Sequence, residues 1–403
     1  MQTFLFETKP DVSAVIDRLS RADGAYLKFL SANDLGLTGA HQAGMYLTKD
    51  CWSLFFDRPG RSGENRKQDV RIRFDGGYEA EASAYWYGGG SRSEYRLTKL
   101  GFFRNREESF LGSLFVLARL DDEYFASVLT DGEDIDGLLN FFGISPAETG
   151  RLLKFELEER LRPHVEEFLG EVGPGFPDTA TFARWSQKIF GDIYGQTLSA
   201  DAALLELVEI DYALFRMVEK RRYEYLFLRP FESLESLLSV SLEISNRRKS
   251  RAGLSFEYHL RFLFEEAGLP FSHGEETEHK KKPDFIFPGV NAYHNPAYER
   301  DRLFFLGAKT TCKDRWRQIL DEARKDRIPV KHLVTLERSL TAAQMKQMHA
   351  ADVRLVVPER YHSSFRAEDR ERLMSLEAFI ALVRSGISAN AGEQDLFGLP
   401  ARS

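Results

Sequence analysis

The chain has 403 residues, of which 43% are hydrophobic, and a formal net charge of −7. This length allows two domains with separate cores, and the negative charge argues against a protein that coats nucleic acid nonspecifically. Only Cys51 and Cys312 occur, which fits a reducing cytoplasm and excludes a cysteine zinc site. No segment resembles a membrane span or a signal peptide, so we expect a cytoplasmic protein without membrane contact.

The first part of the chain predicts short strands. Residues 68–75 alternate apolar and charged side chains, which is typical of a half-buried strand. We predict further strands over 78–87, 94–100 and 111–120, followed by a helix over 153–168. Many short strands joined by glycine-rich turns indicate a barrel.

A change in composition predicts a domain boundary. Residues 170–177 contain three glycines and two prolines, and neither a helix nor a strand continues through such a segment. We therefore expect a first domain over 1–169, a linker over 170–182, a second domain over 183–384 and a flexible tail over 385–403.

The second part of the chain alternates helices with a few strands. We predict helices over 202–220 and 254–267, short buried strands over 285–287 and 303–308, and then a helix over 313–327. The remaining predicted elements are a strand over 331–336, a helix from 341, a strand over 354–357 and a helix over 370–383. This pattern indicates a mixed sheet flanked by helices.

Two charged residues mark the ends of the predicted strands in the second domain. Asp284 follows Pro283, which favours extended backbone, and begins the first strand, whereas Lys309 ends the second. Adjacent strands would bring the two side chains together. A carboxylate can bind a divalent cation, and a lysine can stabilise charge on a phosphate, so the pair predicts phosphodiester hydrolysis.

A second carboxylate is expected at an unusual position. The order is the Pro-Asp … (Asp/Glu)-x-Lys pattern of restriction-type nucleases, except that Gly307 stands where the second acid is usual. Glycine has no side chain to bind a metal. The helix predicted over 313–327 carries Glu322, 13 positions after Lys309, and can return a carboxylate to the metal. Each element alone is more often structural than catalytic, but their order and spacing together favour a nuclease.

Further charged residues are candidates for DNA contact. Lys313, Asp314 and Arg315 follow the catalytic lysine, and such residues can donate to guanine or accept from cytosine. The alternative is an ordinary first helical turn with an acid favoured by the helix dipole. Basic clusters at 247–251, which includes Lys249, and at 280–282 flank the predicted site, and this favours phosphate binding over a plain solvated face.

Glu257 lies on the helix predicted over 254–267. It is a candidate for holding a second metal or a bound water, and a plain surface glutamate is the alternative.

Several segments resemble EcoRII-type restriction endonucleases. In the second half these are 245–253, 281–285, 292–294, 309–320 and 353–358, and in the first half 30–34, 38–39 and 41–42. The resemblance covers most of the chain in the same order. It implies a multi-domain protein with an N-terminal all-β B3-like DNA-binding pseudobarrel and a C-terminal α/β restriction-endonuclease-like PD-(D/E)xK core.

The resemblance also implies an activity. A Mg2+-dependent homodimer would cut both strands of double-stranded DNA at a CCWGG-like pseudo-palindrome with CC and GG flanks, with the central pair flipped out of the stack. The N-terminal domains would block the catalytic cleft until they bind a second, effector copy of the DNA. A cognate DNA methyltransferase would be the genetic partner.

In the first domain the resemblance implies five candidate DNA contacts, of which two match the family less closely. The closer ones are Arg92, Glu94 and Arg96, in a segment that follows three glycines, and the weaker ones are His41 and Tyr46. An ordinary charged hairpin is the alternative interpretation. Phe29 and Ser83 stand where the family has DNA-contacting arginines, so the target preference of this domain can differ from the family's.

Two other functions stay open. One is a DNA-binding regulator with an idle nuclease fold, and the other is a structure-specific DNA repair nuclease. The intact set of Asp284, Lys309 and Glu322 speaks against an idle site. The separate N-terminal DNA reader and the triplet 313–315 speak against a repair nuclease.

Overall fold

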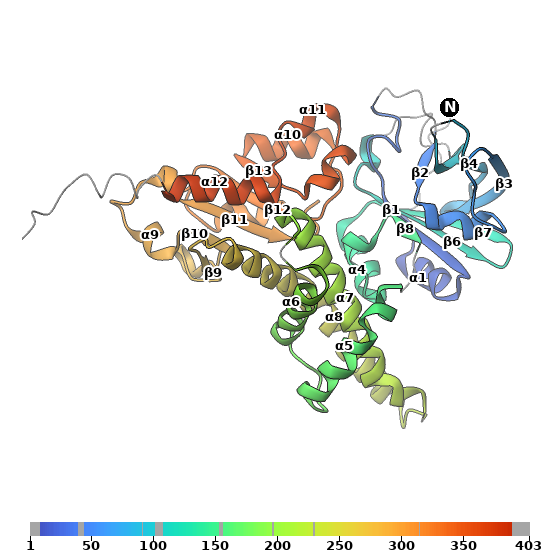
Figure 1. Ribbon diagram of the computed structural model, residues 1–403, viewed down its shortest axis with the longest axis horizontal. Coiled ribbons are helices and arrows are strands. Elements are labelled where there is room, and N and C mark those ends of the chain that lie inside the picture. Colours follow the sequence, from blue (N-terminus) through green and yellow to red (C-terminus); the bar gives the residue numbers. More distant parts are fainter. Residues whose placement is uncertain are drawn as a thin grey trace, which may run out of the picture.

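The computed structural model describes two sheets, one in each half of the chain, joined by long helices (Figure 1). The described residues are 9–38, 44–90, 92–100, 108–152, 156–195, 197–228, 230–313 and 315–388. Within these ranges, no helix combines the length and the apolar composition that crossing a membrane requires. Most of the tail predicted over 385–403 lies outside them.

The first half forms one eight-stranded sheet in the order β2-β5-β4-β3-β7-β6-β1-β8. Its strands are β1 (Gly24–Phe29), β2 (Met45–Leu47), β3 (Asn65–Phe74), β4 (Glu79–Tyr87), β5 (Glu94–Thr98), β6 (Leu114–Leu120), β7 (Glu123–Leu129) and β8 (Arg151–Leu152). Helices α1 (Val12–Arg21) and α4 (Gly132–Phe142) share a core with β1 and β6. The mostly β character of this half agrees with the prediction.

The sequence predicts some of these strands more clearly than others. β3 shows the predicted alternation, because Val70, Ile72 and Phe74 are buried while their charged neighbours are exposed. Periodicity does not predict β1, since Leu27 enters one core and Tyr26 the other, so apolar residues follow one another without alternation.

Four long helices connect the sheets. They are α5 (Glu156–Val172), α6 (Thr179–Tyr194), α7 (Ala200–Tyr223) and α8 (Leu234–Glu266). The side chains of Asp178, Ser199 and Ser233 cap the starts of α6, α7 and α8 by accepting backbone N–H groups. Only residues 173–178 separate α5 from α6, so the expected linker over 170–182 is mostly helical.

Two of these helices depart further from the sequence prediction. The apolar residues of α5 pack in the same core as α7, so this helix adds to the C-terminal half and does not close the N-terminal one. α8 begins at Leu234, twenty residues before the helix predicted over 254–267. Its first half carries leucines at helical spacing that remain exposed, but the serines between them favour a helix only weakly, and the sequence prediction missed it.

The second half forms a five-stranded sheet in the order β13-β12-β11-β10-β9. The strands are β9 (Ser272–His273), β10 (Phe285–Phe287), β11 (Phe304–Lys309), β12 (Lys331–Thr335) and β13 (Val353–Val356). β11, β12 and β13 run parallel, whereas β10 pairs antiparallel with β9 and β11. β11 is a nearly continuous apolar run, and every residue of β12 is buried, because both faces of the sheet are covered.

Helices cover both faces of this sheet. α8 and α12 (Leu376–Ser388) share one face, where Phe264 and Phe379 meet Phe287. The 3-10 helix η8 (Trp316–Asp321) packs on the other face against Gly307. The other α-helices described beside this sheet are α9 (Val290–His294), α10 (Ala342–Ala350) and α11 (Ala367–Arg370). The last predicted helix, over 370–383, corresponds to α12, which begins six residues later at Leu376, whereas α11 ends at Arg370 where the prediction starts.

The helix predicted over 313–327 is wrong in type and length. The structure has the six-residue η8, followed by turns. Buried Lys331 of β12 explains where it ends, because its Nζ donates to Ile319 O at 3.0 Å and also to Leu320 O. These carbonyl groups would accept backbone N–H groups if an α-helix continued.

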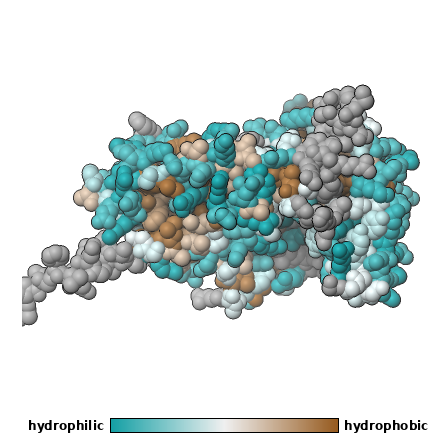
Figure 2. All heavy atoms as spheres, turned by 90° about the horizontal axis from the view of Figure 1, so that it is seen from above, coloured by the Kyte–Doolittle hydropathy of each residue, from teal (hydrophilic) through white to brown (hydrophobic). Residues whose placement is uncertain are grey.

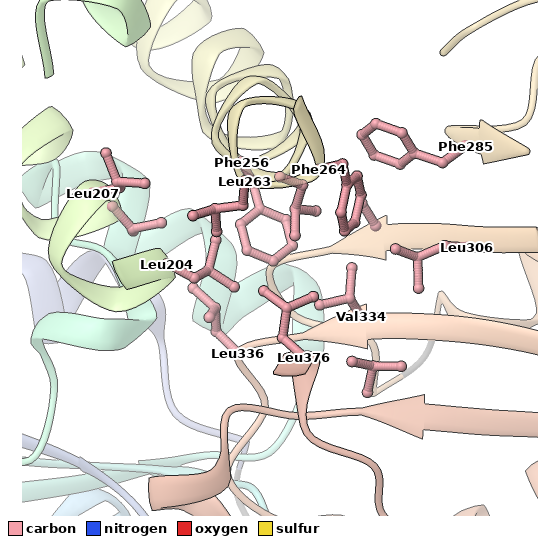
Figure 3. Close-up of a cluster of buried hydrophobic side chains, with 14 of the residues drawn as sticks. Leu204, Leu207, Phe256, Leu263, Phe264, Phe285, Leu306, Val334, Leu336 and Leu376 are labelled. Carbon is pink, nitrogen blue, oxygen red and sulfur yellow. The ribbon is translucent and has the colours of Figure 1, made fainter. Parts of the chain in front are cut away.

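Phe264 occupies the centre of the C-terminal core. Its ring meets Phe285 and Phe287 edge-on, with centroids 5.2 Å away in both cases. It belongs to a cluster of buried side chains from α7, α8, β10, β11, β12 and α12 (Figure 3). By contrast, the coloured part of the face in Figure 2 is mostly hydrophilic. Burial of these aromatic rings therefore holds α8 on the sheet.

Replacing Phe264 by alanine tests this packing. Phe264→Ala removes a fully buried ring, so we expect the free energy of unfolding of the C-terminal half to fall by about 3–5 kcal/mol. Urea denaturation followed by tryptophan fluorescence measures it. Leu254→Ala on the same helix is the matched control, because Leu254 is 38% exposed and should cost far less. Equal losses for the two variants would contradict this role of Phe264.

Candidate active site

The pairing of β10 with β11 brings Asp284 and Lys309 together. Phe285 lies opposite Leu306, so the residue before β10 reaches the end of β11. Asp284 Oδ2 accepts hydrogen bonds from the backbone N–H of Ala308 at 2.7 Å and from Lys309 Nζ at 3.3 Å. The side chains of Asp284 and Lys309 are only 13% and 21% exposed. Their charges therefore interact with little screening by water.

Gly307 has a steric role beside this pair. A Cβ atom added at Gly307 would lie 2.6 Å from Cγ2 of Ile319 in η8, a distance that real contacts do not allow. A carboxylate at this position, where restriction-type nucleases usually carry one, would collide with η8. The glycine lets η8 lie directly on β11.

Glu322 follows η8 and turns toward the same pair. The ammonium group of Lys331 holds the carbonyl groups at the end of η8, and Thr277 Oγ1 donates to Glu322 O at 2.8 Å. Burial and the nearby charge of Asp284 raise the pKa of the Glu322 carboxyl to about 7. Its Oε2 is buried and has no hydrogen-bond partner among the described residues. An oxygen left in this state is costly unless a ligand satisfies it.

The two carboxylates fit a divalent cation. Burial also raises the pKa of Asp284, although Lys309 opposes the shift. Two buried carboxylates that disfavour each other's charge are relieved by a cation between them. No cluster of three or more His, Cys, Asp or Glu side chains suited to a metal occurs in the described part of the chain. Asp284 and Glu322 would thus be the side-chain ligands, a number that suits Mg2+, which keeps several waters.

Glu257 of α8 lies near Asp284, and its negative charge contributes to the raised pKa of that carboxyl. Glu257 Oε2 is 2.9 Å from His273 Nε2. His273 stands opposite Phe285 in the register of β9 and β10, and its ring packs against the Phe285 ring. The sequence did not indicate His273, because a two-residue strand leaves no periodic signal.

The candidate base-reading residues lie beside the N-terminal half of the chain. A cavity of about 260 Å³ is lined by Asp136, Lys249, Glu257, Lys309 and Arg315, among others. Within it, Arg315 forms an ion pair with Asp136 of α4. Outside it, the Nζ atom of Lys313 is 3.3 Å from Ser113 Oγ. Asp314 lies outside the described residues.

The basic cluster at 247–251 is mostly structural. Arg248 pairs with Glu219 at 2.9 Å, and Arg247 pairs with Glu243 at 2.6 Å. Arg251 is buried and bound to Asp211, also buried. The expectation that this cluster binds phosphate is wrong for Arg248 and Arg251, because each is held by a buried carboxylate, whereas Arg247 pairs with exposed Glu243 on the same helix. Lys249 differs, since its exposed side chain borders the cavity.

The candidate DNA contacts of the first half gather on β2, β5 and the loop before β5. Tyr46 is 38% exposed and lies opposite Arg96 in the register of β2 and β5. Arg96 is buried and bound to Glu94 at 2.9 Å. Arg92 is exposed, with its guanidinium over the Tyr87 ring. His41 lies outside the described residues.

Comparison with known proteins gives matches over both halves of the chain. The family described as "Restriction endonuclease EcoRII, N-terminal" matches residues 21–143, and "EcoRII C terminal" matches 215–380. The type II restriction enzyme EcoRII of Escherichia coli is 33% identical over 379 residues, which cover 88% of this chain and 93% of that enzyme. The type II restriction enzyme SsoII of Shigella sonnei is 26% identical over 149 residues, which cover 35% of this chain and 48% of that enzyme.

Solved structures give weaker matches. Metal-depleted Ecl18kI in complex with uncleaved, modified DNA is 17% identical, with a TM-score of 0.42, over 60% of this chain and 87% of that one. The restriction endonuclease PspGI–substrate DNA complex is 16% identical, with a TM-score of 0.42, over 57% of this chain and 93% of that one. The assignment therefore depends on the sequence matches, which span nearly the whole of the E. coli enzyme: the chain belongs to the EcoRII family of type II restriction endonucleases.

Proposed function

We propose that Asp284, Lys309 and Glu322, with Mg2+, carry a double-strand DNA cleavage activity. The observation that supports this most is the buried Glu322 oxygen, which has no hydrogen-bond partner among the residues that the structure describes and lies close enough to Asp284 for that charge to raise the pKa of Glu322. A cation would satisfy that oxygen and remove the repulsion. An idle DNA-binding regulator gains nothing from keeping such a costly arrangement.

Each residue has a distinct task in this mechanism. When bound, the metal makes a water nucleophilic and polarises the scissile phosphate. Asp284 and Glu322 would hold the metal, and the hydrogen bond from the Ala308 N–H fixes the direction of the Asp284 carboxylate. Lys309 donates to Asp284 and lies where its ammonium group can stabilise charge on the phosphate oxygens. Glu257, held by His273, orients a water or a second metal.

We further propose that Lys313, Asp314 and Arg315 read the CC and GG flanks of a CCWGG-like site whose central pair is flipped out. The triplet lies between the catalytic strand and η8, so base contact and cleavage would share one support. Incubating the protein with unmethylated plasmid and Mg2+ and sequencing the ends tests this. Discrete ends at one motif support restriction, absence of cutting supports a regulator, and cuts only at branched DNA support a repair nuclease.

For the N-terminal half we propose a B3-like pseudobarrel, built from the strands up to β8, that binds effector DNA. The catalytic domain then begins with α5, which the expected boundary at 169 had assigned to the first domain. The eight-stranded sheet and the family match to 21–143 support this. Exposed Tyr46 and Arg92 would contact the DNA directly. Buried Arg96 would reach DNA only after releasing Glu94.

Asp136 supports an autoinhibited state. It accepts a hydrogen bond from Thr311 Oγ1 at 2.7 Å and pairs with Arg315, so an acid of the N-terminal half occupies a cation proposed to bind DNA. Binding of effector DNA would draw α4 away and free Arg315. A chain starting at residue 178 would lack Leu161, Val165 and Phe168 of the C-terminal core, so the full chain is the better material for testing this.

Other contacts reinforce the docked state. Arg216 holds Glu148 at 2.9 Å, and Arg338 donates to Thr149 O at 2.8 Å. Because these pairs cross between the halves, their loss should loosen the docking without touching the catalytic residues. We also propose that the active form is a homodimer in the cytoplasm and that a cognate DNA methyltransferase is its genetic partner.

The Lys309→Ala variant tests the catalytic assignment. We expect cleavage to fall by about 10²–10³-fold or more, because the charge that stabilises the transition state is gone. DNA binding, measured by mobility shift, should persist. Lys346→Ala, which changes an exposed lysine of α10, should cut normally, and chelation by EDTA should stop cleavage in both. Cleavage by Lys309→Ala at the normal rate would overturn the assignment.

Restoring the usual acid should harm the enzyme. Gly307→Asp places a side chain against Ile319 and displaces η8, so Glu322 moves and we expect cleavage to fall about 10²-fold. Adding Ile319→Ala makes room and should recover part of the rate. Plasmid cleavage rates for the two variants measure this. A fully active Gly307→Asp enzyme would mean that η8 does not depend on the glycine.

Removing the proposed inhibitory acid should activate the enzyme. Asp136→Ala frees Arg315, and we expect faster cleavage of DNA with a single site, by about 5–150-fold, the range of typical coupling energies. Glu133→Ala, an exposed acid on the same helix, should leave the rate unchanged. Initial rates on a single-site plasmid measure the effect. No increase for Asp136→Ala would argue against this contact as the lock.

A further inference from the structure

Glu337 is a buried acid that the proposed mechanism does not use. It lies two residues after the end of β12 and is only 2% exposed. Burial raises the pKa of its carboxyl to about 7, whereas the nearby charge of Lys313 opposes the shift. A buried carboxyl is costly unless hydrogen bonds satisfy it, so the partners of Glu337 indicate what it does.

These partners lie at the start of the triplet 313–315, which is proposed above to read the bases. Glu337 Oε2 accepts a hydrogen bond from the backbone N–H of Cys312 at 3.2 Å. A hydrogen bond from the Lys313 backbone also favours the charged form and lowers the pKa of Glu337. One carboxyl group therefore binds the backbone at which the triplet begins.

Gln344 of α10 holds the other side of Lys313. Its Nε2 atom donates to Lys313 O at 2.9 Å. The amide has a fixed orientation, because the backbone N–H and the hydroxyl group of Thr341 both donate to Gln344 Oε1, each at 3.0 Å. The donor end of the amide is therefore left facing the triplet.

The segment between β11 and η8 needs such support. Its described residues, 310–313 and 315, belong to no helix or strand, so their backbone groups need other partners. Leu336 N–H supplies a third contact by donating to Thr310 O at 3.1 Å. Together with Glu337 and Gln344, it ties this segment to the chain that follows β12.

We propose that Glu337 and Gln344 are positioning residues for sequence recognition, because they fix the backbone from which the triplet 313–315 reaches the bases. The inference rests on the proposed function, in which this triplet reads the DNA. A hydrogen bond to a base edge weakens steeply when its donor is misplaced, so a loose backbone lowers discrimination between sequences. The contact between Asp284 and Lys309 does not involve these residues, so the cutting chemistry is retained.

Two variants of Glu337 in the full chain test this. Glu337→Leu fills similar space without an acceptor, whereas Glu337→Gln keeps an oxygen that can accept the Cys312 N–H. Discrimination is the ratio of cleavage rates for a duplex with the motif that the wild type cuts and a duplex with one flanking base pair changed. We expect Glu337→Leu to lower this ratio by about 5–150-fold, the range for one bidentate base contact, and Glu337→Gln to restore most of it.

The loss should fall on the motif alone. Cleavage of the changed duplex should stay near the wild-type rate, whereas a misfolded protein would cut both duplexes slowly. Both rates are measured in the same excess of unlabelled motif DNA, so that the N-terminal half is occupied equally. An unchanged ratio for Glu337→Leu, or an equal fall in both rates, overturns the role of Glu337.

Gln344→Glu tests the second residue without disturbing the start of α10. It keeps the oxygen that Thr341 binds but has no donor for Lys313 O, so we expect a similar fall in the ratio. Gln347→Glu makes the same change at an exposed position of α10, where its oxygen can still accept from Arg317, and should behave as the wild type. Equal ratios for Gln344→Glu and Gln347→Glu would contradict the role of Gln344.

Loosened docking of the two halves is the competing explanation for an effect of Glu337→Leu. Gly112 of the first half packs on the same segment, because a Cβ atom there would collide with Ser339 O and lie 3.5 Å from Glu337 Oε1. If Glu337 only secured this contact, Glu337→Leu would cut single-site DNA faster with its discrimination unchanged. That result would overturn the proposal.

The proposed function can fail separately. A wild-type protein that cuts no DNA refutes the nuclease assignment, and the positioning role falls with it. A wild type that cuts at a discrete motif, with normal ratios for Glu337→Leu and Gln344→Glu, refutes only the positioning role.

Discussion

The close contact between Gly307 and Ile319 is the constraint on which the proposed active site depends. The missing side chain on β11 lets η8 lie against the sheet, and the end of η8 delivers Glu322 beside Asp284. An acid at 307 and an acid at 322 therefore exclude each other, because the first would displace the helix that supplies the second. Lys331 and Thr277 secure the arrangement by binding backbone carbonyl groups at the end of η8.

The sequence predicted much of the nuclease half because its signals are local. Pro283, the apolar runs around Asp284 and Lys309, and the spacing to Glu322 each lie within a few residues of the feature they mark. The sequence did not predict the roles of His273 and Lys331, because these residues lie on other strands than Asp284 and Lys309. A buried lysine that binds carbonyl groups has no acidic neighbour in the sequence to reveal it. The α-helix predicted around Glu322 was wrong for the same reason, since Lys331 takes the carbonyl groups that would continue it.

Charge patterns were the least reliable guide. The cluster at 247–251 suggested phosphate binding, yet Arg248 and Arg251 bind Glu219 and Asp211 on α7. Whether an arginine or lysine side chain is available to bind phosphate depends on acidic residues far away in the chain, and composition cannot show these. Asp136 is the converse case, because nothing near it in the sequence relates it to Arg315. In the N-terminal half, β1 was not predicted since both of its faces are buried.

The pair formed by Asp136 and Arg315 has a consequence for ionic strength. Arg315 remains 44% exposed, so dissolved ions screen its attraction to Asp136. The same ions compete with arginine for DNA phosphates. On the proposed mechanism, salt weakens both the contact of Arg315 with Asp136 and its contact with DNA. Raising the salt concentration would then lower the affinity for DNA while changing the competition between Asp136 and DNA for Arg315 much less.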